Sequence, residues 1–299
     1  MRIIILNGSL ILFAILSGCK TTYTNSEKMI GYNLTSPDVT ISLPDILHEI
    51  SGITYMDSIS FACIQDEKGI LFSYNVIKKE IISQLTFHSK GDYEGITRVD
   101  KTIYVLRSDG KIFEISDFES TEFKVKSYTT SIPANDNEGL CYDQNNNRLL
   151  IACKGKIRKG DKHKDKRVIY GFDLQSKTLT KKPVFEFDLK VIKKFGLDNN
   201  FNLPTKEKKK RLLTEPVIRL ETSDIAIHPL TKKLFVLSSI GQFLFIFDMN
   251  GTIEHIEKLN PLLFNQPEGI TFFENGDMLI SNEGKIRKAT VLRFNYRMK

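Results

Sequence analysis

The chain has 299 residues, and its 43 Lys and Arg exceed its 36 Asp and Glu enough to give a formal net charge of +7 at pH 7. So modest an excess over this length does not indicate a nucleic-acid-binding protein. The 20 Phe, the 10 Tyr and the many β-branched residues, with almost no helical periodicity, predict one all-β domain. The chain has no Gly-x-Ser-x-Gly, His-Glu-x-x-His, Cys-x-x-Cys or phosphate-binding glycine motif, which argues against hydrolases and redox enzymes of those types.

The N-terminus has the pattern of a signal peptide. Arg2 precedes a mainly apolar run over residues 3–16. This run is shorter than the roughly 20 residues that a membrane-spanning helix needs. We therefore expect residues 1–18 to be a cleaved signal peptide and not a permanent membrane helix.

The residues Leu16, Ser17, Gly18 and Cys19 resemble a bacterial lipobox, in which the cysteine thiol carries the lipid. The resemblance implies that Cys19 is lipidated and anchors the protein to a membrane. Residues 19–29 are then a polar tether. Because Lys20 and not Asp follows the cysteine, the lipoprotein pattern implies an outer-membrane location in the cell envelope, facing the periplasm or the surface.

Three further cysteines, Cys63, Cys141 and Cys153, are an odd number, which does not fit a disulfide framework. We expect buried thiols, with a bridge between Cys141 and Cys153 as the alternative.

A five-residue phrase recurs along the chain, typically Glu-Gly-Ile-Thr followed by an aromatic or basic residue. The five copies begin at Ser51, Glu94, Glu138, Ser223 and Glu268. Their starts are 43, 44, 85 and 45 residues apart. A period of about 40 to 50 residues, with several short strands in each unit, is the signature of a β-propeller blade.

Each unit continues with two further apolar strands, and a more polar fourth strand closes all units but the last. The last unit ends after its third strand, while residues 39–43 form a predicted strand with no unit of its own. If this N-terminal strand completes the final blade, both unpaired edges disappear. The sequence therefore predicts a five-bladed propeller over residues 30–299, with its last blade closed by an N-terminal strand.

The doubled spacing between Glu138 and Ser223 has two explanations. A sixth blade with a decayed phrase is one. We prefer an insertion at about residues 188–221, in which residues 188–195 form a short helix and the following residues, including 199–211, form loops.

Several of the phrases resemble a known family. They are Asp92-Tyr93-Glu94-Gly95-Ile96, Asn137-Glu138-Gly139-Leu140, Ala226-Ile227-His228-Pro229 and Pro267-Glu268-Gly269-Ile270. Their order is similar to that in the SdiA-regulated family of exported β-propeller proteins and, more distantly, to NHL and gluconolactonase-like propellers. The resemblance implies a propeller with five blades or a similar number. The chain departs from the pattern at Ser51 and in its basic third unit.

In a propeller the first strand of each blade lines the central channel. Glu94, Glu138 and Glu268 share one position on these strands, and Asp224 falls beside it. Carboxylates that converge in a channel repel one another unless a cation or protons neutralise them. A Ca²⁺ ion held by oxygen ligands is one solution. The other is that each carboxylate accepts hydrogen bonds from backbone N–H groups of a neighbouring blade.

The turns after the second strands lie at one mouth of the predicted channel and offer further candidates for ligand binding. The residues are Asp66, Asp109, Ser239, Asn282 and Glu283. Loops on a rigid scaffold often carry function, but these residue types also populate turns for conformational reasons. Both explanations stay open from sequence alone.

Two basic stretches, residues 154–167 and 206–211, belong to the third unit. They are either a cationic patch for anionic lipid or an acidic partner, or solvated loops.

We therefore expect a monomeric, membrane-anchored binding or scaffolding module that recognises a small ligand or an envelope protein. The alternative is a Ca²⁺-dependent hydrolase of lactones or phosphoesters that uses the channel carboxylates.

Overall fold

The computed structural model describes residues 30–134, 136–157, 164–208 and 213–297. Cys19, the expected signal peptide and the whole expected tether lie outside these ranges. In the part of the chain that the structure describes, no helix is both long and apolar enough to cross a membrane.

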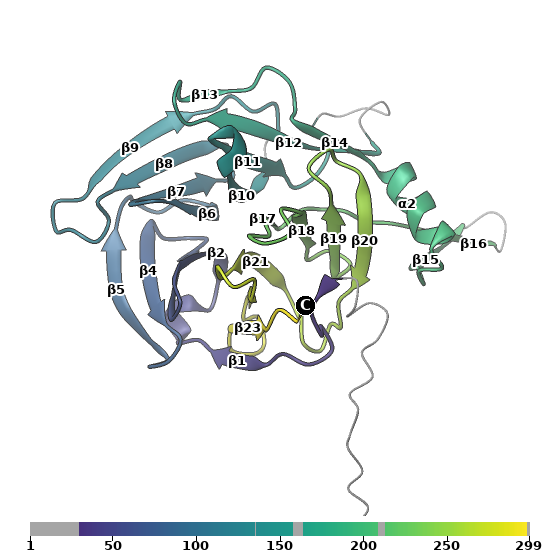
Figure 1. Cartoon of the computed structure of the whole chain (residues 1–299), viewed down its shortest axis with the longest axis horizontal. Helices are drawn as coiled ribbons and strands as arrows, with labels where there is room; N and C mark the ends of the chain where they lie inside the picture. The colour runs from purple at the N-terminus through teal and green to yellow at the C-terminus, as the bar shows by residue number, and fades with distance from the viewer. Residues whose placement is uncertain (1–29, 135, 158–163, 209–212, 298–299) are drawn as a thin grey trace, which may run out of the picture.

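Five small antiparallel sheets stand around a central axis (Figure 1). The first blade has β2 (Ile50–Asp57), β3 (Ser60–Gln65), β4 (Ile70–Asn75) and β5 (Glu80–Thr86). The second has β6 (Tyr93–Val99), β7 (Thr102–Arg107), β8 (Lys111–Ser116) and β9 (Lys124–Thr129). The third has β10 (Asn137–Asp143), β11 (Arg148–Cys153), β12 (Lys166–Asp173), β13 (Thr178–Leu179) and β14 (Phe185–Asp188). The fourth has β17 (Asp224–Ile227), β18 (Leu234–Ser238), β19 (Phe243–Phe247) and β20 (Ile253–Lys258). The prediction of a five-bladed propeller is confirmed.

The fifth blade joins the two ends of the described chain. It has β21 (Pro267–Phe272), β22 (Met278–Asn282), β23 (Thr290–Phe294) and, as its outer strand, β1 (Val39–Ser42). β1 pairs antiparallel with β23 over its whole length, from Val39 opposite Arg293 to Ser42 opposite Thr290. The predicted closure of the last blade by an N-terminal strand is therefore present. The outer edge of β23, which would otherwise be unpaired, is paired with β1.

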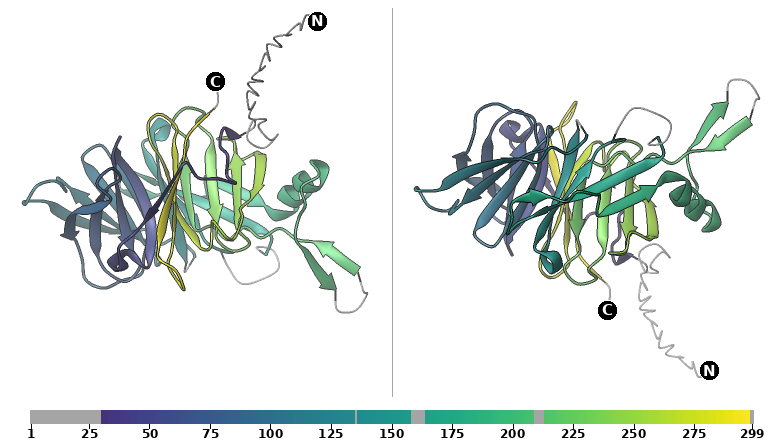
Figure 2. Two further views of the ribbon diagram at one scale, coloured as in Figure 1. Left: turned by 90° about the horizontal axis from the view of Figure 1, so that it is seen from below. Right: turned by 90° about the horizontal axis from the view of Figure 1, so that it is seen from above.

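The segment between the third and fourth blades contains a helix and a hairpin. The described residues form no sixth blade there. Helix α2 (Leu189–Asp198) begins at Asp188, whose side chain caps it by accepting from the Lys190 N–H at 2.8 Å. The hairpin of β15 (Thr205–Lys208) and β16 (Leu213–Pro216) follows, where the sequence predicted loops. Figure 2 shows the helix and hairpin projecting beyond the ring. Because the hairpin lies outside the core of the ring, its residues carry no apolar alternation that would reveal strands.

Apolar residues fill the spaces between neighbouring blades. Ile96 of the second blade, for example, packs with Ala62 and Ile64 of the first. Cys63, Cys141 and Cys153 are free, buried thiols within these clusters, as the sequence predicts. The core is therefore divided among the blade interfaces, and each blade depends on its two neighbours.

The innermost strands approach one another very closely at the glycine of the repeated phrase. A Cβ on Gly95 would lie 2.7 Å from the Glu138 carbonyl oxygen and 2.6 Å from the Leu140 Cβ. A Cβ on Gly269 would lie 2.7 Å from the Ser51 carbonyl oxygen. Only glycine fits such contacts without moving the neighbouring strand.

We predict that Gly95→Ala destabilises the protein by about 2 kcal/mol, because overpacking forces two inner strands apart. Gly155→Ala is the matched control, since a Cβ there meets nothing within 4 Å. Urea unfolding of both variants checks this. Equal midpoints for the two variants would contradict the close approach.

Candidate functional site at the acidic mouth

The starts of the innermost strands form one mouth of the channel. Glu94, Glu138 and Glu268 are each the second residue of their strand. Second strands run antiparallel to first strands, so the turns that follow them lie at the same mouth. We call this end of the channel the acidic mouth, defined by Glu94, Asp136, Glu138 and Glu268.

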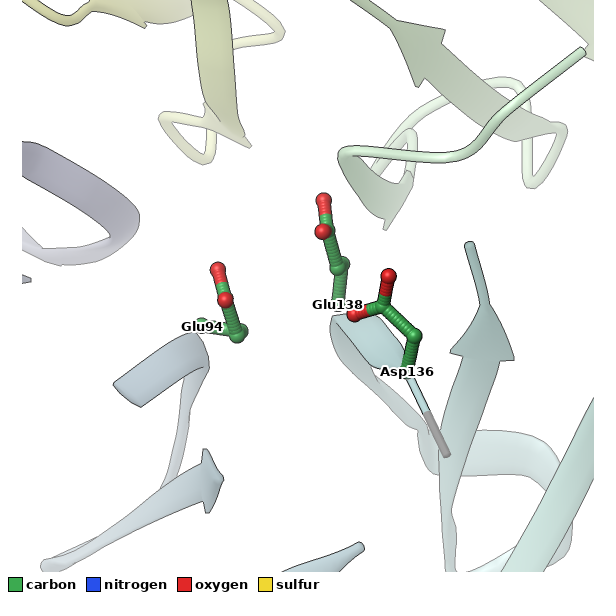
Figure 3. Close-up of side chains that lie close together, drawn as sticks. All are labelled: Glu94, Asp136 and Glu138. Carbon is green, nitrogen blue, oxygen red and sulfur yellow. The ribbon is translucent and has the colours of Figure 1, made fainter. Parts of the chain in front are cut away.

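Three carboxylates come together here. Glu94, Asp136 and Glu138 each offer an oxygen atom, and these atoms all lie within 4.8 Å of one another (Figure 3). The ammonium of Lys154 forms an ion pair with Glu138 and lies 3.8 Å from the Asp136 Oδ2 atom. Ser51 Oγ lies 3.4 Å from the Glu94 Oε2 atom, at the long end for a donated hydrogen bond. The cluster is therefore a set of acceptors around one cationic group.

Burial disfavours the ionised form of two of these carboxylates, Glu94 and Glu138. Burial, together with the Glu138 carboxylate nearby, holds the pKa of Glu94 well above its ordinary value. Burial also raises the pKa of Glu138, although Lys154 acts in the opposite direction. Burial lowers the pKa of Lys154, but Glu138 and Asp136 outweigh it and raise that pKa overall. The lysine is therefore fully charged, and the carboxylates compete for its single positive charge.

Glu268 lies apart from this three-residue cluster. Burial raises its pKa to about 7, with the Gln266 side chain lowering it and the Glu283 carboxylate raising it. Its charge still affects the cluster, because it raises the pKa of Glu138.

Asp224 has a different role from the glutamates. It is 1% exposed, and it accepts the N–H of Ile225 at 2.8 Å, of Ile270 at 2.9 Å and of Leu140 at 3.3 Å. Burial nevertheless holds its pKa well above the usual range. The carboxylate thus joins the third, fourth and fifth blades near the channel axis. Acceptance of backbone N–H groups is the alternative to a bound cation that the sequence analysis left open.

Two of the five predicted turn residues extend the acidic mouth. Burial raises the pKa of Asp66 to about 6, and the Glu49 and Glu283 carboxylates add to this. Glu283 accepts a hydrogen bond from the Gln266 amide. Asp66 and Glu283 therefore belong to one negative field, from the first and the fifth blade respectively.

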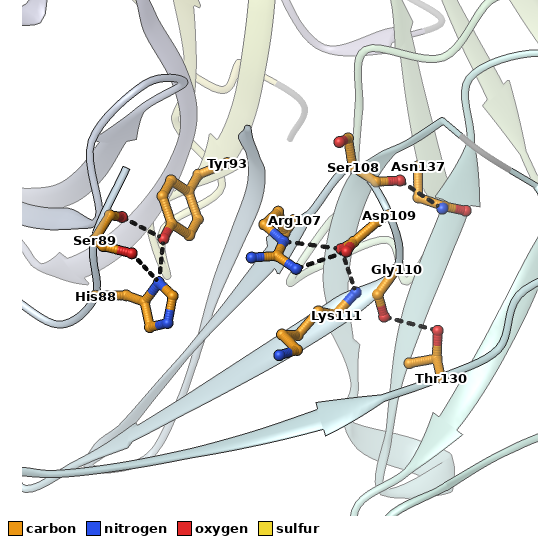
Figure 4. A network of polar contacts seen from close by, with 10 residues as sticks. All are labelled: His88, Ser89, Tyr93, Arg107, Ser108, Asp109, Gly110, Lys111, Thr130 and Asn137. Carbon is orange, nitrogen blue, oxygen red and sulfur yellow. Dashed lines mark hydrogen bonds and ion pairs between the residues drawn. The ribbon is translucent and has the colours of Figure 1, made fainter. Parts of the chain in front are cut away.

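The other three predicted turn residues are occupied by contacts within the protein. Asp109 binds the Arg107 guanidinium at 2.6 Å and the Lys111 N–H at 3.1 Å, within the network of Figure 4. The Ser239 carbonyl accepts from the Gln242 N–H at 3.1 Å. The Asn282 amide donates to the Leu263 carbonyl at 3.3 Å. Asp109 and Ser239 match the conformational explanation for turn residues. Asn282 does not lie in the turn, because it is the buried last residue of β22, and its amide joins two segments 19 residues apart.

The sequence analysis missed two members of the cluster, Asp136 and Lys154. A signal for Asp136 exists, because the phrase Asp-x-Glu-Gly occurs twice, at Asp92 and at Asp136. Lys154 was grouped with the basic stretch that it begins, and no local pattern separates it from its neighbours.

The fold and this site define a class, a five-bladed β-propeller with a cluster of three carboxylates at one mouth of its channel. No protein-family model matches the sequence, and no curated protein matches it. Among solved structures, the chain is similar to Myxococcus xanthus glutaminyl cyclase, with a TM-score of 0.56 and 12% identity over 87% of this chain and 95% of that chain. It is also similar to a protein of unknown function from Bacteroides caccae, with a TM-score of 0.43 and 12% identity over 75% of this chain and 65% of that chain. The first likeness shows the fold alone, and the second is too distant to carry an argument.

We predict that Glu94→Gln stabilises the protein at pH 8 by about 1 kcal/mol or more and has no effect at pH 4. The folded state holds the Glu94 proton more tightly than the unfolded state, so the wild type loses stability as pH rises above the ordinary glutamate pKa. Glutamine removes this loss because it cannot ionise. Thermal unfolding at both pH values checks this, with the exposed Glu119→Gln as control. Stabilisation of the same size at pH 4 would exclude a proton-linked cause.

Proposed function

We propose that this protein is a ligand-binding module and that its acidic mouth binds a small molecule through a primary ammonium group. The observation that carries the proposal is the position of the Lys154 ammonium, which contacts Glu138 and lies close to Asp136. The site therefore already accommodates the functional group that it would recognise.

The chemistry of the cluster favours an ammonium ligand. An ammonium has three N–H donors, and three carboxylates within 4.8 Å of one another supply matching acceptors. Buried carboxylates are costly when ionised, and a second positive charge would relieve that cost. The cluster has three carboxyl groups around the single cationic group of Lys154, although the whole chain carries a net charge of +7.

Ca²⁺ is the second candidate for the same site, because Glu94, Asp136 and Glu138 could all ligate an ion. Ca²⁺ takes six to eight oxygen ligands. The described residues bring three carboxylates together, fewer groups than a site with six to eight oxygen ligands usually uses. The fit is therefore poorer than for an ammonium. The Ca²⁺-dependent hydrolysis of lactones or phosphoesters would use these same residues.

We predict that cadaverine binds the purified protein at pH 7.5 and that pentane-1,5-diol, the uncharged analogue, does not. Glu138→Gln should weaken cadaverine binding about tenfold or more, because it removes a charge-assisted hydrogen bond. Isothermal titration calorimetry measures both, with Glu119→Gln as the control variant.

Two results would count against an ammonium site. Equal binding of the diol would show that charge is not recognised. A melting temperature raised by CaCl₂ but not by cadaverine would support the calcium candidate instead.

We also propose that the module is held in the cell envelope by a lipid on Cys19, in the manner of the bacterial lipoproteins whose lipobox residues 16–19 resemble. The lipobox-like residues 16–19 and the polar character of residues 19–29 support this proposal. The tether would leave the propeller free to meet a soluble ligand.

We predict that Cys19→Ser abolishes the incorporation of labelled palmitate in cells and leaves the melting temperature of the propeller unchanged. The control is Cys63→Ala, which removes a buried thiol and should retain the label. Continued labelling of Cys19→Ser would disprove the anchor.

A further inference from the structure

The channel has a cavity at the mouth opposite the acidic mouth. It measures about 540 Å³ and is lined by the later residues of all five innermost strands. Arg98, on its wall, is four residues beyond Glu94 on the same strand, which corresponds to about 13 Å. The cavity is therefore separate from the acidic mouth, and its volume lies in the range of about 300 to 1,000 Å³ that small-molecule sites occupy.

Five aliphatic residues line the inner end of this cavity, and each also belongs to an apolar cluster of the core. The residues occupy equivalent positions in the five blades and are each at most 2% exposed: Ile53, Ile96, Leu140, Ile225 and Ile270. The backbone amides of Leu140, Ile225 and Ile270 bind the Asp224 carboxylate. A ligand that enters the cavity therefore meets an apolar floor and has no direct contact with the acidic mouth.

The next position outward carries a hydroxyl in three of the five blades. Thr54 Oγ1 accepts the Arg98 N–H at 3.1 Å, and Thr271 Oγ1 accepts the Tyr55 N–H at 3.1 Å. Thr97 occupies the equivalent place in the second blade and lines the same cavity. Each hydroxyl that accepts a backbone N–H also has its own hydrogen to donate to a ligand oxygen.

The rim combines aromatic rings with planar polar groups. Tyr55 and Tyr142 are half-buried and line the opening. The Arg98 guanidinium is held by the Asp100 carbonyl at 2.7 Å and by the Met56 carbonyl. Further polar side chains around the rim are Asp100, Gln144 and Glu274.

The charges of this rim differ from those of the acidic mouth. Arg98 is positive, while Asp100 and Glu274 are acidic, so neither an anion nor a cation is favoured over the whole opening. A second pocket of about 290 Å³ shares Tyr55 and Tyr142 with the cavity. The site therefore extends beyond the volume of one small ring.

We propose that this cavity binds a neutral polyhydroxylated ligand of one or two sugar units. A sugar ring has an apolar C–H face, which suits a tyrosine ring, and a hydroxyl edge that both donates and accepts hydrogen bonds. The threonine hydroxyls and the planar polar groups of the rim match that edge. The proposal does not depend on the ligand of the acidic mouth.

The test is a titration of the purified protein with glucose, galactose, N-acetylglucosamine, maltose and cellobiose, followed by methyl NMR of isoleucine and threonine. Binding of at least one sugar should shift the methyl signals of Ile53, Ile96, Thr97 and Thr271. Tyr142→Ala should weaken that binding about tenfold, because the stacking face is lost. Tyr142→Phe keeps the ring and should retain most of the affinity.

Glu138→Gln, at the other mouth, is the control and should leave sugar binding unchanged. If no sugar in the panel shifts these methyl signals, the proposal is wrong. It is also wrong if Tyr142→Ala and Tyr142→Phe bind with equal affinity, or if acetate or methylammonium shifts these signals and no sugar does.

Discussion

The close approach of the five innermost strands is the constraint on which the rest of the structure depends. In four blades a glycine lies against the next inner strand. A Cβ on Gly52, Gly95, Gly139 or Gly269 would come within about 3 Å of that strand's backbone. The fourth blade has Asp224 where the other four have glycine. The Asp224 carboxylate accepts a hydrogen bond from the Ile270 N–H of the next inner strand. The ring is thus tight at its centre, and the channel is divided into two separate mouths.

This division lets one scaffold hold two sites of different chemistry. The acidic mouth uses the first residues of the inner strands, where Glu94 and Glu138 are kept close together despite their repulsion. The free energy that this repulsion costs is supplied by the apolar packing between the blades, which does not depend on the state of the site. The opposite cavity uses later residues of the same strands, where acidic and basic groups are mixed.

The sequence predicted the architecture well because the repeated phrase and its spacing report directly on the blades. It also predicted that Glu94 and Glu138 lie near each other in the channel, since equivalent positions in a propeller lie around one axis. It could not separate Asp224 from the glutamates, because an acidic residue that accepts backbone N–H groups looks the same in sequence as one that faces a ligand. Lys154 was missed because its role depends on Glu138, and the pairing of β10 with β11 that brings the two together is not visible in a local pattern.

The pairing of β1 with β23 also determines the order in which the molecule can fold. The other four blades consist of strands that are near one another in sequence, so each can assemble from local segments. The fifth requires distant segments to meet, as the ion pair of Asp38 with Arg297, 259 residues apart, illustrates. Contacts between segments distant in sequence form slowly, so we expect the ring to close last. Until it does, β23 has an unpaired edge and the facing sides of the first and fifth blades are uncovered, which makes the open ring the species most vulnerable to aggregation and proteolysis.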